Sequence, residues 1–347
     1  MKKIKKLKIE GGNKMKKSVL LLITLLMVVI SFSVSLVDVF EIAKEKSNIY
    51  KIAQIDLEKT LLDYDKTMIE AINKKIELAG ELAYQKGLMD YNNSIKEYYA
   101  DILSRVFNLY LQEINVNIVT LQLKSAQINY DNSKELYNRG LISDDDLKIA
   151  ELDVKDVENY LKNSQISLET AQDNLKKVYD GDIREITIVV PTLDGLFVSD
   201  EEYLNKSYAL KLAKLNAALS EYDLNNLPSN ASIYTKKITE ATHQKNLLTL
   251  EDTEDKLLEA HKIIINSLEI LDRTLQNLQE RVKLSQKTFN DTKNRFDKGL
   301  VSELELNVAN INYLNSQKTY YESLQNYLKT YINYVVDTGR SLKEVGL

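Results

Sequence analysis

The chain contains no cysteine and no tryptophan, and only 2 prolines and 10 glycines among its 347 residues. The lack of cysteine excludes a disulfide framework, thiol chemistry and a lipid carried by an N-terminal cysteine. Glycine and proline mark most turns, so their scarcity favours long helices over a compact mixed fold.

Residues that often bind metals or carry out catalysis are also scarce. The chain has two histidines, His243 and His261, which lie 18 positions apart, and His261 falls in an apolar heptad stripe. We therefore expect structural roles for both and no metal site. The sequence also lacks a nucleophile elbow and a phosphate-binding loop, which argues against an enzyme and predicts no cofactor.

The long apolar run near the N-terminus extends from Val19 to Ile30, after a pair of lysines and before a serine-rich stretch. This order is typical of a secretory signal peptide. The run is shorter than the ~20 apolar residues that span a bilayer, which makes an uncleaved membrane anchor the weaker alternative. We expect residues 1–35 to be a signal peptide, cleaved after Ser33 or Ser35.

Residues 1–14 precede a second methionine, Met15, at which we hypothesise that translation starts. The codons for Glu10-Gly11-Gly12 can form a ribosome-binding site just upstream of Met15. Without residues 1–35 the chain keeps 38 basic and 50 acidic side chains, a net charge of −12. Nucleic-acid binding calls for a basic face, so we expect no nucleic-acid partner.

The chain carries an internal duplication. The stretch ELYNRGLISDDDLKIAE at 135–151 is answered by NRFDKGLVSELELNVAN at 294–310, and the shared glycines, Gly140 and Gly299, lie 159 positions apart. Between the two copies, IREITIVV at 183–190 predicts a short strand. We therefore divide the chain into a first repeat at 36–181, a linker at 182–195, a second repeat at 196–339 and a C-terminal tail at 340–347.

Apolar residues recur every seven positions in both repeats. In the first repeat, stripes run from Ile95 to Tyr137 and from Leu147 to Leu175; in the second, they run from Leu268 to Phe296 and from Leu306 to Tyr334. Sustained heptads predict antiparallel coiled-coil helices. A helix over 95–139 would be roughly 65 Å long and would need neighbours to bury its apolar faces.

Each pair of stripes meets at a Gly-Leu-[Ile/Val]-Ser sequence. Gly140 and Gly299 stand where one helix must end and the chain must reverse, which favours a positive φ. A serine three positions after each glycine, followed three positions later by an acid, has the spacing of a capping box. The pairs are Ser143 with Asp146 and Ser302 with Glu305. We therefore predict two helical hairpin tips.

Duplication, signal peptide and matched tips together resemble the TolC-like outer-membrane efflux proteins over nearly the whole exported chain. The resemblance implies a mainly α fold, in which long antiparallel coiled-coil helices in two tandem repeats form one third of a trimeric α-helical tunnel. It implies short or reduced strands at the membrane end, which in this family join a shared β-barrel. It also implies an exported protein of the cell outer membrane, with its helical part in the periplasm.

In this family the hairpin tips meet a periplasmic adaptor that is linked to an inner-membrane pump. Carried over by position, the tip residues are Tyr137, Arg139, Gly140, Leu141 and Ser143 in the first repeat and Phe296, Lys298, Gly299, Leu300 and Ser302 in the second. Asp146 and Glu305 stand where family members often place acids at the tunnel mouth, and they can equally act as caps. The neighbouring Asp144, Asp145 and Glu303 are expected to lie in solvent.

The membrane end departs from the family pattern. IELAGELAY at 76–84 alternates, with Ile76, Leu78, Leu82 and Tyr84 opposite glutamates, and is our candidate strand, with a turn at Gly87. Residues 88–98 resemble the remnant of a second strand, and residues 229–239 match more weakly still. A reduced barrel, a tunnel capped by short strands, and docking to another outer-membrane protein all stay open.

We expect an exit duct of a tripartite efflux or type I secretion system, built as a homotrimer. The alternative from another class is a non-conducting periplasmic coiled-coil spacer or stalk, which heptads and a signal peptide alone would allow. A receptor that keeps its N-terminal anchor would need a signalling region, and none is found. The matched tips favour the duct, because a spacer has no use for two hairpins at one end.

Overall fold

The computed structural model describes residues 34–182 and 186–347, and most of that length is helical. The predicted signal peptide lies outside the described residues except for its last two positions. The helices are α2 (Leu36–Lys44), α3 (Asn48–Glu70), α4 (Lys74–Asn138), α5 (Asp144–Lys176), α6 (Asp200–Lys206), α7 (Tyr208–Asn225), α8 (Ile233–Asp297) and α9 (Glu303–Asp337). The strands are β1 (Val34–Ser35) and β2 (Ile186–Thr187).

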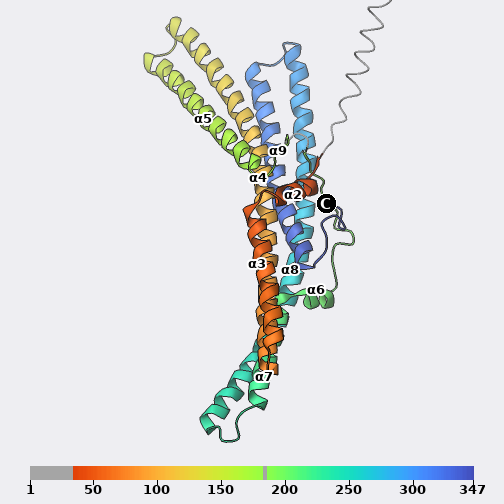
Figure 1. The fold of residues 1–347 in the computed structure, drawn as a ribbon. Coiled ribbons are helices and arrows are strands. Elements are labelled where there is room, and N and C mark those ends of the chain that lie inside the picture. The colour runs from red at the N-terminus through yellow and green to blue at the C-terminus, as the bar shows by residue number, and fades with distance from the viewer. Residues whose placement is uncertain (1–33, 183–185) are drawn as a thin grey trace, which may run out of the picture.

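Two long helices, α4 and α8, run the length of the molecule and have 65 residues each. At ~1.5 Å per residue, each spans roughly 98 Å. Helices α3 and α5 pack on the two ends of α4, and α7 and α9 pack in the same way on α8 (Figure 1). Contacts of α4 with α7 and α9 join the halves. The predicted fold of long antiparallel helices in two tandem repeats is confirmed.

The bulkiest buried side chains lie where the short helix α2 packs against α4 and where α9 ends. Tyr98 on α4 and Tyr327 on α9 are fully buried. The Tyr98 hydroxyl donates to the backbone carbonyl of Phe40 in α2, and the Tyr327 hydroxyl donates to that of Pro191 at 2.7 Å. Besides packing in the core, these two tyrosines use their hydroxyls to hold α2 and the linker against the long helices.

The strand predicted in the linker is confirmed in part. β2 pairs in parallel with β1, with Val34 opposite Ile186, while residues 183–185 of the predicted strand lie outside the described residues. Ser35 ends β1 and caps α2, since its hydroxyl accepts from the Asp38 backbone N–H at 3.1 Å. Of the two cleavage positions considered, only the one after Ser33 leaves β1 and this cap intact.

The strand predicted at 76–84 is wrong: Ile76, Leu78, Leu82 and Tyr84 all lie in the first turns of α4. Tyr84 stacks on Tyr64 of α3 with ring centroids 4.5 Å apart, and the Tyr64 hydroxyl donates to Glu81 at 2.8 Å. The alternation of leucine and glutamate fits a helix equally well, and packing against α3 decides between the two.

Gly80 and Gly87 explain how α3 and α4 come so close. A side chain at Gly80 would collide with Thr67 of α3, and one at Gly87 would collide with Thr60. The turn predicted at Gly87 is therefore wrong, because the glycine admits a neighbouring helix instead of reversing the chain.

The other strand remnants are also helical. Residues 88–98 continue α4, and α8 begins at Ile233, within the predicted strand at 229–239. The Ser232 hydroxyl caps α8 by accepting from the Thr235 backbone N–H at 3.1 Å. Across residues 34–182 and 186–347, no helix has both the length and the apolar composition needed to cross a bilayer.

Candidate functional site: the paired hairpin tips

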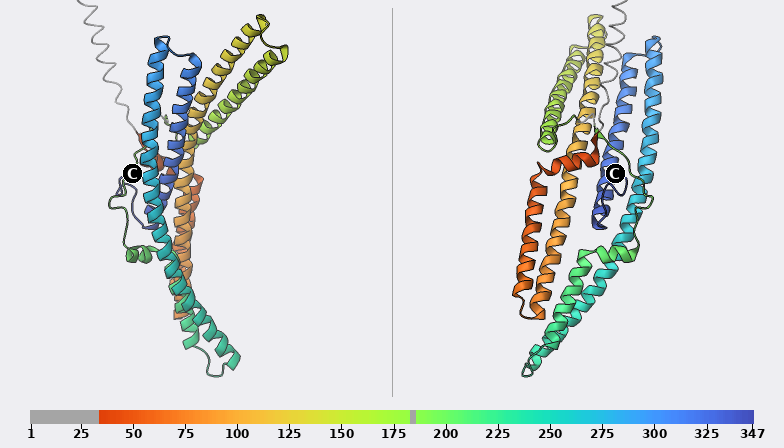
Figure 2. Two further views of the ribbon diagram at one scale, coloured as in Figure 1. Left: turned by 180° about the vertical axis from the view of Figure 1, so that it is seen from behind. Right: turned by 45° about the vertical axis from the view of Figure 1, so that its right-hand side comes forward.

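Both Gly-Leu-[Ile/Val]-Ser sequences form helical hairpin tips, and both tips lie at the same end of the molecule (Figures 1 and 2). Gly140 has φ 73° and Gly299 has φ 70°, as the sequence predicts. In the first tip the Leu141 N–H donates to Leu136 at 3.0 Å, and the Leu300 N–H makes the matching bond to Arg295 at 2.9 Å. These bonds define a Schellman motif, which ends each helix and reverses the chain.

The two return helices begin differently despite their matched spacing. Ser143 and Asp146 form a complete capping box: the serine hydroxyl accepts from the Asp146 N–H at 3.1 Å, and the Ser143 N–H donates to the carboxylate at 3.0 Å. The bonds from Ser143 hold the pKa of Asp146 below its usual range. Ser302 accepts from the Glu305 N–H at 3.2 Å, but the Glu305 side chain does not complete a box.

The tips present apolar side chains to solvent. Leu141 and Leu300 are each 66% exposed, and Tyr137 is exposed as well, whereas Phe296 is half-buried. Arg139 pairs with Glu135 on its own helix. The residues predicted to contact an adaptor thus lie on two turns at one end of the molecule (Figure 1), and nothing within the described chain covers the two leucines.

The start of α9, next to the second tip, is held to α4 of the first repeat, whereas the first tip extends past this contact. Glu303, at the start of α9, pairs with Lys124 of α4, and Asn307, which is 3% exposed, donates to the Ser125 hydroxyl at 3.1 Å. Glu303, expected to lie in solvent, is 37% exposed and also forms this ion pair, whereas Asp144 and Asp145 are exposed as expected.

Beyond this contact the first hairpin projects alone. Helix α4 runs on from Ser125 to Asn138, which is roughly 20 Å at ~1.5 Å per residue. In Figure 1 this hairpin leans away from the α8–α9 hairpin. The contact at Ser125 and Asn307 is therefore the point from which the first tip diverges from the second.

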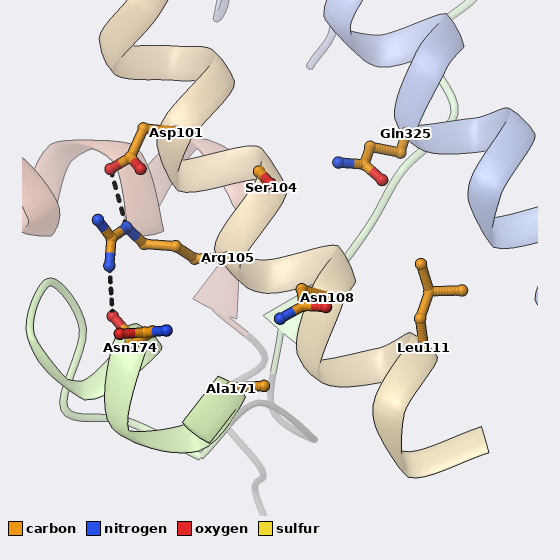
Figure 3. A pocket seen from close by; sticks show the side chains of 8 residues that line it. All are labelled: Asp101, Ser104, Arg105, Asn108, Leu111, Ala171, Asn174 and Gln325. Atoms are coloured by element: carbon orange, nitrogen blue, oxygen red, sulfur yellow. Dashed lines mark hydrogen bonds and ion pairs between the residues drawn. The ribbon is translucent and has the colours of Figure 1, made fainter. Parts of the chain in front are cut away.

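A polar cavity of about 360 Å³ lies between α4, α5 and α9 (Figure 3). Arg105 of α4 crosses one side of it, donating to Asp101 at 2.8 Å and to the backbone carbonyl of Asn174 at 2.8 Å. That carbonyl belongs to the last turn of α5, where helix carbonyls lack partners within the helix. Arg105 therefore has a structural role in the cavity wall, where it caps the C-terminal end of α5.

The two histidines have structural contacts. His261 is 1% exposed, its Nδ1 lies 2.7 Å from Asp200 of α6, and its Nε2 lies 3.1 Å from the hydroxyl of Tyr334. His243 Nδ1 lies 3.1 Å from the Ser220 hydroxyl. His261 thus fastens α6 to α8 and α9. In the part of the chain that the structure describes, no three potential metal ligands are brought together.

Solved structures of outer-membrane channels share this architecture. The CmeC outer membrane channel of Campylobacter jejuni is 13% identical with a TM-score of 0.55, covering 88% of this chain and 85% of that chain. The outer membrane protein VceC of Vibrio cholerae is 12% identical with a TM-score of 0.55, covering 88% of this chain and 96% of that chain. CusC is 12% identical with a TM-score of 0.54, covering 88% and 92%.

No protein-family model matches the chain, and no curated protein matches it significantly. Likeness at 12–13% identity shows the fold, and the chain has the fold of these outer-membrane channels. The resemblance to TolC-like proteins is confirmed at that level.

Proposed function

We propose that the chain is the protomer of a trimeric exit duct of a tripartite efflux or type I secretion system. The observation that carries the proposal is an open layer of helices with two unpaired apolar edges. At the tip end, α5 packs on α4, α4 on α9 and α9 on α8, so the layer has α5 at one edge and α8 at the other. Such a layer is completed when edges of neighbouring copies meet in a ring.

Both edges carry exposed aliphatic side chains with heptad spacing. On α8 these are Ile263, Ile270 and Leu284, which are between 58% and 65% exposed. On α5, Leu152 and Ile166 are separated by two heptads and are about half exposed. Large apolar side chains on a helix face with this period are typical of a coiled-coil partner.

The two edges can be aligned along the molecule by contacts between neighbouring helices. Ser164 of α5 bonds Asn115 of α4 at 3.0 Å. Tyr110 of α4 stacks on Tyr321 of α9 with centroids 5.5 Å apart. Ser316 of α9 lies 2.5 Å from Ser285 of α8. Because neighbouring helices run antiparallel, these contacts place Ile166 on α5 level with Leu284 on α8. The exposed aliphatic side chains of the two edges therefore lie at the same level along the molecule and could pack against each other.

The hairpin tips fit the role of an adaptor-binding end. Leu141 and Leu300 are exposed at one end of the molecule, on turns made rigid by their Schellman bonds. In the proposed assembly, three copies would present six such turns to a periplasmic adaptor and, through it, to an inner-membrane pump. Asp146 and Glu305 would then stand near the tunnel mouth, where a ring of acids favours cations.

In this role the protein would lie in the cell outer membrane, exported by its signal peptide, with the helices in the periplasm. The rival is a non-conducting coiled-coil spacer of the envelope.

Deleting the gene should raise the cellular accumulation of fluorescent dyes that efflux pumps expel, and the intact gene should restore low accumulation. Unchanged accumulation of every dye, together with unchanged protein secretion, would favour the spacer.

A further inference from the structure

The half of the molecule opposite the hairpin tips is also an open layer of helices. Here α3 packs on α4, α4 on α7 and α7 on α8, so the layer has α3 at one edge and α8 at the other (Figure 2). The tip half likewise contains four helices, with α5 and α8 at its edges. One copy therefore brings four helices to a ring in either half, and α8 is an edge along the whole molecule.

The edge face of α3 carries an apolar stripe. Ile55, Leu62 and Ile69 are seven positions apart and between 62% and 85% exposed. Thr60 and Thr67 of the same helix lie against glycines of α4. Leu62 and Ile69 each stand two positions after one of these threonines, which turns them by about 200° around the helix. The stripe therefore points away from α4, and nothing within the described chain covers it.

The edge face of α8 carries a stripe with the same spacing. Tyr234, Ala241 and Leu248 are seven positions apart, and all three are exposed. His243 and Asn246 of the same helix bond to residues of α7. Ala241 and Leu248 are each two positions from one of these residues, so they lie on the side of α8 that faces away from α7. Exposed heptad stripes of this kind are typical of helices that pack against a partner helix.

Contacts between neighbouring helices align the two stripes along the molecule. They join α3 to α4, α4 to α7 and α7 to α8: Tyr64 with Glu81 at 2.8 Å, Lys75 with Asp223 at 2.6 Å, and Ser220 with His243 at 3.1 Å. Because neighbouring helices run antiparallel, these contacts place Leu62 of α3 level with Leu248 of α8. They also place Ile69 level with Ala241, so a large side chain stands opposite a small one.

Charged side chains alternate with these apolar pairs. By the same alignment, Lys59 of α3 is level with Glu251 of α8, and Asp65 of α3 is level with Lys245 of α8. Lys66 has no acid at its own level on α8. Two of the three lysines that interrupt the stripes therefore stand opposite an acid of the other edge, where an ion pair helps to fix the alignment of two helices.

A second copy of the chain is the partner that fits both stripes. Helix direction alternates across the layer, so α8 of one copy against α3 of the next continues the alternation. A single repeated rotation brings these unlike edges together at every contact of a ring. Net charge does not select another partner, because α3 carries three lysines and five acids and residues 233–256 carry four lysines and five acids.

We propose that α8 of one copy packs against α3 of the next as an antiparallel coiled coil, at the levels of Leu62 and Leu248. The inference rests on the proposed duct, because the ring is what brings α8 to a neighbouring copy. It goes beyond that proposal by assigning a helix-to-helix subunit contact to the half of the molecule in which the sequence predicts strands.

Cross-linking of a Leu62→Cys/Leu248→Cys variant tests this contact. The chain has no cysteine of its own, and within one protomer α4 and α7 separate the two positions, so a short bismaleimide cannot join them internally. Both side chains are 62% exposed, so circular dichroism should report unchanged helix content. The matched controls are Leu62→Cys and Leu248→Cys alone, because the proposed ring brings α3 to α8 and never two like helices together.

We expect the double variant to give covalent products that increase to three chains and stop there, and each single variant to stay at one chain. A two-chain product from either single variant would overturn the inference, since like edges would then meet.

A second pair, Ile166→Cys/Leu284→Cys in the tip half, separates this contact from the duct itself. If that pair gives three-chain products and Leu62→Cys/Leu248→Cys gives none, the inference is overturned while the duct stands, and another protein or a lipid covers the two stripes. If neither pair gives products, the inference and the duct are both overturned.

Discussion

Replacing Ile270 and Leu284 by lysine should convert the proposed trimer into monomers without unfolding the chain. Both side chains are more than 60% exposed in the single protomer, so the substitutions remove nothing from its own core. In the proposed ring each is buried against a neighbour, and burial of an aliphatic side chain stabilises by about 1.5–3 kcal/mol. Because about 1.4 kcal/mol is a tenfold change, the dissociation constant should rise at least about a hundredfold.

Analytical ultracentrifugation of the purified protein measures this change, and circular dichroism checks that the helices persist. Gln276→Lys is the matched control, because Gln276 is exposed on another face of the same helix, where it bonds Asp272 at 2.8 Å. The control should remain trimeric. A lysine double variant that sediments like the wild type would show that α8 is not a subunit edge.

In the proposed duct, replacing Leu141 and Leu300 by aspartate should abolish substrate export while leaving the trimer intact. Each leucine is 66% exposed, and the bonds that shape its turn come from the backbone, so neither folding nor the turn depends on the side chain. If the tips bind an adaptor through these residues, two charges per protomer, six per trimer, would have to be buried without partners, which is costly. The variant gene should then leave dye accumulation as high as in the deletion strain.

The conservative change Leu141→Met/Leu300→Met separates this role from mere disturbance of the turn. Methionine keeps an apolar side chain of similar size, so this variant should restore most of the low accumulation. The amount of protein in the envelope must be equal in the strains compared. Full complementation by the aspartate variant would show that the leucines do not face an adaptor.

Short-range signals in the sequence predicted the tips correctly. Gly140 and Gly299 are followed by serines that cap the next helix, and these relationships involve residues within a few positions of one another. Heptads of apolar residues predicted the long helices for the same reason, since the period of a stripe is a local property. Candidate tip residues could therefore be named from the sequence alone.

Most of what the sequence did not reveal depends on contacts between residues far apart in the chain. Residues 76–84 are helical and pack closely against α3, which Gly80 and Gly87 admit, and the alternating leucines and glutamates cannot indicate this contact. Lys124 and Glu303 are 179 positions apart, so their pairing has no local signature. Glu305 has the spacing of Asp146, yet only the aspartate completes its capping box, and the spacing does not indicate this difference.

The most direct test of the trimeric duct is cross-linking of its edges. The chain has no cysteine, so an Ile166→Cys/Leu284→Cys variant carries the only two thiols. Within one protomer these positions are on α5 and α8, with α4 and α9 between them, so a short bismaleimide cannot join them internally. For a trimeric duct we expect covalent products that increase to three chains and stop there. Products that stop at two chains, extend beyond three, or never form would contradict it.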